Sequence, residues 1–302
     1  MGGIGSFRSV AARARFVGIY EACLAGLPPV SESFDVPTRF GTVRAYRFDG
    51  GAGRPVVLLP GRNSSTPMWE DNLPGLLERR TVYCVALLGE PGLSVQTREL
   101  TGAADQAQWF DELLAGLRLD SIHLMGLSFG GWSATNYAVR KPDRVASLAL
   151  LDPVMTFAPI PIRTMMAVLP MTIPRTPERL RRRVLSYLSG GAAVDDSVPV
   201  ARLIASGSAD FELHQPMPVR FTDAELRSLT VPVLAIIAGR SVIHDARRAD
   251  RQARKVLRNS RVELWPDASH AVNGEYPDRI AQCAHDFWDH ADSGADGVRA
   301  SR

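Results

Sequence analysis

The sequence predicts an α/β protein in which helices flank a mostly parallel central sheet and an inserted helical cap interrupts the alternation. From residue 36 onward, short apolar runs alternate with segments of helical periodicity. The runs are apolar almost throughout, which is typical of strands buried on both faces of a parallel sheet. The segment between residues 153 and 222 is far longer than an ordinary crossover, and its length indicates the inserted cap.

Composition places the chain among globular proteins and excludes several classes of function. The chain has 302 residues, of which 45% are hydrophobic and 22% are charged, and its formal net charge is +3. This near balance gives no reason to expect nucleic acid as a partner, and no apolar run approaches the ~20 residues of a membrane span. The composition thus leaves a small-molecule substrate and a homo-oligomer open.

The cysteines and the cofactor motifs bear on compartment and chemistry. Three cysteines, Cys23, Cys84 and Cys283, form no disulfide framework and fit a reducing compartment. Because no clear cleavage site follows the N-terminal segment, we expect a cytoplasmic protein. No group of Cys and His has metal-ligand spacing and no nucleotide-binding glycine motif occurs, so we expect neither a metal nor a cofactor.

The first elements in the chain are a helix and an antiparallel strand. An amphipathic helix is expected to end before Pro28 and Pro29. Residues 40–46 alternate between apolar and polar side chains and predict an antiparallel strand, followed by a turn at Asp-Gly-Gly, residues 49–51. Further strands are expected at residues 56–59, 82–88, 122–125, 146–151, 233–238 and 262–265.

Helices are predicted between these strands by apolar residues at helical spacing. One helix carries Trp109 and Phe110 on its apolar face. A second runs from Phe129 to about residue 140 and must stop before Pro142. Two more are expected at residues 246–257 and 277–290.

The segment 153–222 is predicted to be a cap because it breaks the alternation and is rich in methionine and proline. A helix within it begins at Pro177, with Thr176 as its N-cap. The chain is thus expected to comprise a helical lead-in (residues 1–35), a core in two pieces (36–152 and 223–291), the cap (153–222) and a disordered tail (292–302).

The strongest chemical signal is the motif Gly126-Leu127-Ser128-Phe129-Gly130, which follows an apolar run and opens a helix. A strand-to-helix turn this sharp strains its central residue, and the flanking glycines let the strand and the helix approach closely. Ser128 is then presented above the sheet at a helix N-terminus, where developing negative charge is favoured. Ser128 is therefore the candidate nucleophile.

A serine hydroxyl is a poor nucleophile without a base, and His270 is the candidate base. It lies in a loop just after the last strand, and loops at the carboxyl ends of strands form the sites of α/β proteins. His244, in another loop near the same edge, is its only competitor. The remaining histidines lie in a strand, in the cap or on the last helix: His123, His214, His285 and His290.

The elbow at Ser128, the late His270 and the order of elements resemble the α/β-hydrolase superfamily over about residues 36–290. Within it, the chain resembles serine carboxylesterases that carry a helical cap between strands 6 and 7. Three further segments support the resemblance, namely PGRNSS at residues 60–65, GEPGLS at residues 89–94 and NGEYP at residues 273–277.

The resemblance implies the α/β-hydrolase fold and an oxyanion hole made of two backbone N–H groups. These belong to Phe129 and Arg62, with Asn63 as an alternative to Arg62, and together they stabilise a tetrahedral oxyanion. The family usually has histidine before the glycine of this loop, where the chain has Pro60. This difference concerns the shape of the loop and not its N–H donors.

The triad acid has two candidates. In the family it usually follows the strand that corresponds to residues 233–238, but residues 239–245 hold no carboxylate at the expected place. Asp152 follows the expected strand at residues 146–151, and Asp245 lies further along the loop after residues 233–238. Both keep the chain order Ser, acid, His. Asp245 is also a good N-cap and Asp152 is equally a turn residue, so a chain without an acid is the third alternative. A true acid must accept the Nδ1 proton of His270.

The expected function is hydrolysis of a carboxylic ester or related acyl compound with an apolar part, without a cofactor and through an acyl-enzyme. The same fold also allows C–C bond hydrolysis, lactone opening, acyl transfer and a haloperoxidase-like activity. A non-catalytic scaffold with a decayed triad is a further alternative, because no acid stands in the usual place.

Overall fold

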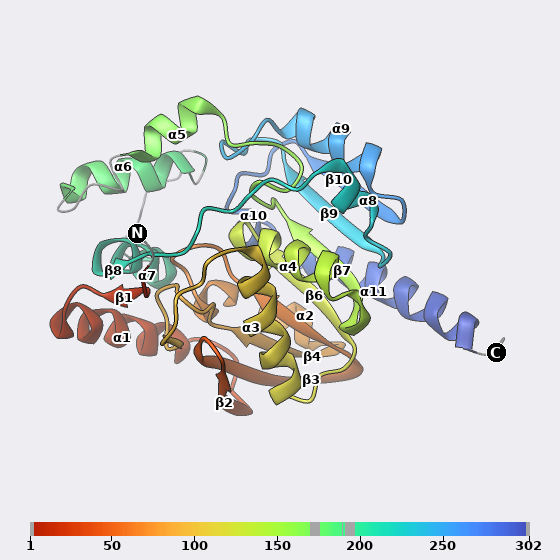
Figure 1. Ribbon diagram of the computed structural model, residues 1–302, viewed down its shortest axis with the longest axis horizontal. Coiled ribbons are helices and arrows are strands. Elements are labelled where there is room, and N and C mark those ends of the chain that lie inside the picture. Colours follow the sequence, from red (N-terminus) through yellow and green to blue (C-terminus); the bar gives the residue numbers. More distant parts are fainter. Residues whose placement is uncertain (1–2, 170–175, 189, 191–196, 300–302) are drawn as a thin grey trace.

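A computed structural model describes residues 3–169, 176–188, 190 and 197–299 of the chain. The strands gather into a central sheet, and helices lie on both of its faces (Figure 1). The helices α5 (Ile162–Val168) and α6 (Glu178–Leu188) lie apart from the sheet, at the upper left of the view (Figure 1). The α/β class predicted from the sequence is therefore confirmed.

The central sheet has eight strands, which span Glu32–Thr38 (β2), Gly41–Leu59 (β3), Arg80–Val85 (β4), Val95–Gln96 (β5), Ile122–Leu127 (β6), Val145–Leu151 (β7), Val233–Ala238 (β9) and Ser260–Trp265 (β10). Their order is β10-β9-β7-β6-β3-β2, with β4 and β5 also paired to β3. The pairs from β10 to β3 along this order are parallel, whereas β2, β4 and β5 pair antiparallel with β3. The sheet is mostly parallel, as predicted.

The strand β3 is continuous where the sequence predicts two strands joined by a turn at residues 49–51. Its register with β4 shifts between Phe48 and Ala52. A Cβ atom on Gly50 would lie 2.3 Å from the carbonyl oxygen of Arg80, so only glycine fits where β3 crosses the beginning of β4. The predicted turn is therefore wrong, and the glycines permit an irregular crossing instead.

The helices of eight or more residues are Val10–Leu24 (α1), Ala103–Gly116 (α3), Phe129–Arg140 (α4), Glu178–Leu188 (α6), Pro199–Asp210 (α7), Ala246–Val256 (α9) and Pro277–Arg299 (α11). Shorter helices lie at Leu73–Leu77 (α2), Ile162–Val168 (α5), Asp223–Arg227 (α8) and Val272–Glu275 (α10), and 3₁₀ turns lie at Thr66–Trp69 and Pro142–Arg144. Across the described ranges, no helix combines the length and the apolar character that a membrane crossing requires.

Two hydrophobic cores lie on the two faces of the sheet, and successive strand residues alternate between them. In β9, Val233 and Ala235 join one core, while Leu234 and Ile236 join the other. The helices α3, α4 and α9 cover the first core, and α1, α2 and α11 cover the second. Because both faces are covered, the strands appear in the sequence as continuous apolar runs.

The N-terminal segment packs against the segment 153–222. The strand β1 (Ser6–Phe7) pairs antiparallel with β8 (Phe211–Glu212), and α1 packs on α7. The Arg15 guanidinium forms an ion pair with the buried carboxylate of Asp210. The expected helical lead-in is thus only partly right: residues 1–35 also supply β1 and the beginning of β2.

The last helix is longer than the sequence predicts. Helix α11 continues to Arg299, beyond the predicted end at residue 290, and residues 300–302 of the expected tail lie outside the described residues. Asp292 pairs with Arg54 at 2.8 Å and with Arg80 at 3.0 Å, and these contacts hold the helix beyond its predicted end.

His123 in β6 is a buried ionisable group whose pKa bears on stability. Its Nδ1 lies 2.8 Å from Ser147 Oγ, its Nε2 lies 3.2 Å from Asp292 Oδ2, and its ring stacks on Trp288. Burial lowers the pKa of His123 to about 4, although the Asp292 carboxylate opposes this shift. The folded protein therefore resists protonation of this ring.

We expect His123 to make the protein less stable in mild acid. The unfolded chain binds a proton at this residue below a pKa of about 6.5, whereas the folded chain binds it only near pH 4. The contribution of neutral His123 to the free energy of unfolding is fully present above about pH 6.5. It is lost as the pH falls, by about 2–3 kcal/mol between pH 7 and pH 4.5. Urea unfolding at both pH values measures it. An equal pH dependence in His123→Gln would contradict this account.

Candidate active site

Three residues singled out from the sequence meet at one edge of the sheet. Ser128 directly follows β6, Asp152 directly follows β7, and His270 lies in the loop between β10 and α10. The carboxyl ends of parallel strands lie at the same edge, which is where sites form in open α/β sheets. The topology therefore brings together residues that are far apart in the chain.

Ser128 occupies a sharp turn between β6 and α4. Its φ of 53° and ψ of −115° are strained for a residue with a side chain. A Cβ atom on Gly126 would lie 2.3 Å from the carbonyl oxygen of Gly130, and one on Gly130 would lie 2.1 Å from that of Leu59. Glycine is therefore required on both sides of the serine, because β3, β6 and α4 approach one another here.

His270 lies between Ser128 and Asp152 and contacts both. Its Nε2 is 2.9 Å from Ser128 Oγ, and its Nδ1 is 2.7 Å from Asp152 Oδ2. When the Nδ1–H donates to the carboxylate, Nε2 is left as the acceptor of the serine hydroxyl. The His270 side chain is 17% exposed, whereas that of Asp152 is fully buried. The imidazole is thus the accessible member of the pair.

The Asp152 carboxylate is held by further hydrogen bonds. Its Oδ1 accepts the backbone N–H of Ala238 at 3.0 Å, and its Oδ2 accepts the Ser241 hydroxyl at 2.6 Å. Burial by itself raises the pKa of Asp152, but the neighbouring imidazoles of His244 and His270 outweigh burial and hold this pKa well below its usual range. The carboxylate is therefore ionised at neutral pH.

The structure also places the competing residues. Asp245 is exposed and caps α9 by accepting the Arg248 N–H at 2.8 Å. His244 is buried, and its Nε2 lies 2.9 Å from Asp152 Oδ1 without forming a hydrogen bond to it. In the described part of the chain, the carboxylate within hydrogen-bond distance of His270 is that of Asp152 alone.

The hydrogen bonds of the backbone distinguish Arg62 from Asn63 as a source of an oxyanion donor. The Asn63 N–H already donates to Glu90 Oε2 at 3.1 Å. For the residues that the structure describes, the N–H groups of Arg62 and Phe129 donate to no acceptor of the protein. These two groups are therefore the ones available to a substrate oxygen.

Strained backbone conformations concentrate around this site. A Cβ atom on Gly61 would lie 3.7 Å from Ser128 Cβ, so the loop that carries Arg62 lies against the serine. Backbone strain at functional sites persists only where the surroundings hold it in place. Apart from Arg118, the described non-glycine residues with positive φ lie in this loop, at the elbow or just after β7: Asn63, Ser65, Ser128, Asp152 and Met155.

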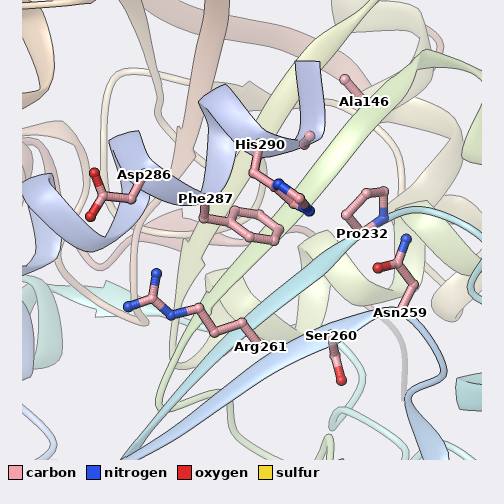
Figure 2. A pocket seen from close by; sticks show the side chains of 9 residues that line it. Ala146, Pro232, Asn259, Ser260, Arg261, Asp286, Phe287 and His290 are labelled. Atoms are coloured by element: carbon pink, nitrogen blue, oxygen red, sulfur yellow. The ribbon is translucent and has the colours of Figure 1, made fainter. Parts of the chain in front are cut away.

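A hollow of about 670 Å³ lies elsewhere and does not belong to this site. Figure 2 shows its lining, in which His290 and Phe287 of α11 lie near Pro232 and Ala146. Of the lining residues, Pro232 directly precedes β9, Ala146 lies at the beginning of β7 and Ser260 begins β10, whereas Ser128 follows a strand. The hollow is therefore at the amino-terminal edge of the sheet, opposite to the candidate active site.

The sequence predictions missed Ser241 and Glu90 near the site, and they considered His244 only as a competing base. Ser241 and His244 flank Asp152, and Glu90 binds the loop beside the serine. Ser241 and His244 lie in the loop after β9, where the resemblance places the acid. That position was the only signal that this loop contacts the candidate triad, and the segment GEPGLS did not by itself distinguish Glu90 from a surface carboxylate.

Sequence comparisons give the chain's relatives. A model of the alpha/beta hydrolase family matches residues 56–283. The chain is 28% identical over 269 residues to the Uncharacterized carboxylesterase nap of Bacillus subtilis (strain 168), which covers 87% of this chain and 88% of that protein. It is 26% identical over 282 residues to Carboxylesterase YbfK of the same bacterium, covering 91% and 94% of the two chains.

Solved structures of bacterial carboxylesterases are also similar to the chain. Carboxylesterase CesB (YbfK) from Bacillus subtilis matches with a TM-score of 0.84 and 25% identity, over 92% of this chain and 98% of that one. Naproxen esterase (carboxylesterase NP) from Bacillus subtilis matches with a TM-score of 0.82 and 27% identity, over 91% and 97%. Because the family model covers well over half of the sequence, the chain belongs to the alpha/beta hydrolase family.

Proposed function

We propose that the chain is a serine hydrolase of carboxylic esters, in which Ser128 is the nucleophile, His270 the general base and Asp152 the acid that orients His270. The observation that carries the proposal is the series of contacts at 2.9 Å and 2.7 Å that links the three side chains. Two relatives that match over most of the chain are named as carboxylesterases, which supports esters as the substrate class.

The first half of the reaction forms an acyl-enzyme. His270 Nε2 takes the proton of the Ser128 hydroxyl while Oγ attacks the ester carbonyl carbon, and the carbonyl oxygen becomes an oxyanion. Asp152 accepts the Nδ1–H and stabilises the imidazolium that forms. The C–O bond to the alcohol then breaks, and His270 returns its proton to the leaving alkoxide.

The second half releases the acid. Water enters in place of the alcohol, His270 Nε2 takes one of its protons, and the hydroxide oxygen attacks the acyl carbon. A second tetrahedral oxyanion forms and collapses, the bond to Ser128 Oγ breaks, and the serine regains its proton from His270. The residues of the chain supply every proton transfer in this scheme.

The oxyanion in both halves is stabilised by the N–H groups of Arg62 and Phe129. Both are free of protein acceptors among the described residues, and Phe129 begins α4, whose N-terminus favours negative charge. Each such donor is worth roughly 3 kcal/mol of transition-state stabilisation. Asn63 is the less suitable donor because its N–H is occupied by Glu90.

Residues 153–222 are proposed to act as a cap over the histidine loop. The Thr164 hydroxyl donates to the Val242 carbonyl, and a Cβ atom on Gly190 would lie 2.6 Å from Ser269 Cβ. The segment therefore touches the loop after β9 and the residue before His270. Its methionines suit an adaptable apolar surface, which supports a substrate with an apolar part.

A cytoplasmic location belongs to the same proposal. The cysteines Cys23, Cys84 and Cys283 are free and buried in the structure. Free thiols are typical of proteins in reducing compartments.

The scaffold alternative was raised because no carboxylate stands in the usual place after residues 233–238. The contact between Asp152 and His270 argues against it, because it supplies His270 with a carboxylate from another strand end.

We expect p-nitrophenyl esters to be hydrolysed, with a preference for longer acyl chains. Hexanoate has four more methylenes than acetate, and each one that enters an apolar pocket is worth roughly 1 kcal/mol or more. Burial of only two of them should already raise kcat/KM at least about tenfold. Initial rates measured across the series test both points. A preference for acetate would overturn the apolar pocket, and no hydrolysis of any ester by folded protein would overturn the proposed function.

A further inference from the structure

Glu90 is a buried carboxylate that the proposed triad does not use. It lies in the loop between β4 and β5, and its side chain is only 4% exposed. Burial raises the pKa of Glu90, although the Arg62 guanidinium and the Asn63 N–H oppose this shift. An isolated buried carboxylate is costly to keep, so its contacts indicate what it does.

The contacts of Glu90 are with the loop that carries the proposed oxyanion donor. Its Oε2 accepts the N–H of Asn63 at 3.1 Å, and its Oε1 lies 3.3 Å from Nε of Arg62. Asn63 has a φ of 63°, which is uncommon for a residue with a side chain. The hydrogen bond that Glu90 accepts from Asn63 therefore holds the backbone where it is strained, one residue after Arg62.

The Arg62 side chain continues from Glu90 to the second donor residue. Its guanidinium lies over the Phe129 ring, 4.4 Å from the ring centroid. Phe129 is buried at the beginning of α4 and also stacks on Trp132. A single series of contacts thus runs from Glu90 through the Arg62 side chain to Phe129, and it joins the two residues whose N–H groups would bind the oxyanion.

We propose that Glu90 is a positioning residue for the oxyanion hole: it anchors the backbone at Asn63 and the guanidinium of Arg62, so that the N–H groups of Arg62 and Phe129 face one point. This inference rests on the proposed serine hydrolase function. Displacing a donor by about 1 Å can cost about 10²-fold in rate. Glu90 touches no reacting atom, and its effect passes through the loop.

Three variants separate positioning from general support of the fold. Glu90→Ala removes both contacts, whereas Glu90→Gln keeps an oxygen for the Asn63 N–H and loses the charge that faces Arg62. Arg62→Met keeps the backbone donor and removes the guanidinium. The matched control is Glu112→Gln, since Glu112 likewise accepts a backbone N–H and a guanidinium, both from Arg39, but on α3.

The readouts are kcat, KM and the inhibition constant of a trifluoromethyl ketone, which forms a tetrahedral oxyanion on the serine. We expect Glu90→Ala to lower kcat by about 10–100-fold with little change in KM, and to weaken the ketone in parallel. The loss of kcat and of ketone affinity should be smaller in Glu90→Gln than in Glu90→Ala, and the loss in Arg62→Met should lie between those of the two Glu90 variants. Glu112→Gln should match the unmodified protein in all three quantities.

A double-mutant cycle checks that the effect runs through one series of contacts. Because Glu90 and Arg62 would act as a unit, the fold-loss in kcat of the double variant Glu90→Gln/Arg62→Met should be smaller than the product of the fold-losses of the two single variants. Thermal unfolding of each variant confirms that folded protein is compared.

Two results would overturn the inference. One is that Glu90→Gln, Glu90→Ala and Arg62→Met all keep the unmodified kcat and ketone affinity. The other is that kcat falls while ketone affinity does not. If the unmodified protein neither hydrolyses esters nor binds the ketone, the proposed function itself has failed, and Glu90 has no oxyanion hole to position.

Discussion

Ester turnover is expected to fall by about 10³–10⁴-fold when Asp152 is replaced by asparagine. An asparagine amide can donate to Nδ1 of His270, which places the ring hydrogen on Nε2 and leaves no acceptor for the Ser128 proton. The Ala238 N–H can still donate to the amide oxygen, and the Ser241 hydroxyl oxygen can accept from the amide nitrogen that replaces Oδ2, so the fold should be kept. Steady-state kinetics and thermal unfolding of Asp152→Asn measure the two effects.

Asp245→Asn is the matched control for this variant. Asp245 caps α9 and contacts the Arg248 N–H, and asparagine is an equally good N-cap. Its turnover should therefore stay within about twofold of the unmodified protein, since surface changes away from such features are small. Near-native rates in both variants would refute the assignment of Asp152, and a large loss only in Asp245→Asn would transfer the role to that residue.

Turnover is expected to fall at least about 10³-fold in both Ser128→Ala and His270→Ala. The first variant removes the attacking oxygen, and the second removes the group that takes its proton. Because the two residues act as a unit, the double variant should be scarcely slower than either single one. Initial rates on one p-nitrophenyl ester, with a Ser133→Ala control on the same helix, give the comparison. Losses that multiply in the double variant would contradict a coupled pair.

Ser128 and His270 could be singled out from the sequence as a candidate pair because each has a local signal. The serine lies between glycines at the end of an apolar run, and such a turn is recognisable from residue types alone. The histidine follows the last strand, and strand ends are predictable from apolar runs. The structure brings the two side chains to 2.9 Å, which the strand order of a parallel sheet makes understandable.

The choice between Asp152 and Asp245 could not be made from the sequence. Both follow strands that end at the same edge, and the decision depends on which loop passes beside His270. That distance is a property of loop conformation, and the φ of 41° at Asp152 has no signature in residue type. Only the role of Asp245 as an N-cap could be recognised beforehand.

Other differences have the same origin in contacts between distant residues. The glycines at residues 49–51 indicate a turn when only the sequence is considered, but close approach to the backbone of Arg80 requires glycine just as strictly. The helix beyond residue 291 depends on ion pairs of Asp292 with Arg54 and Arg80. The burial of Glu90 likewise depends on a loop that lies 27 residues earlier in the chain.

The most direct test of the central claim is covalent labelling of the folded protein with a fluorophosphonate, followed by mass spectrometry of the intact chain and its peptides. The account predicts a single phosphonyl group on Ser128, a much slower reaction in His270→Ala and no adduct at that position in Ser128→Ala. Absence of labelling in folded protein, or an adduct on a different residue, would contradict it.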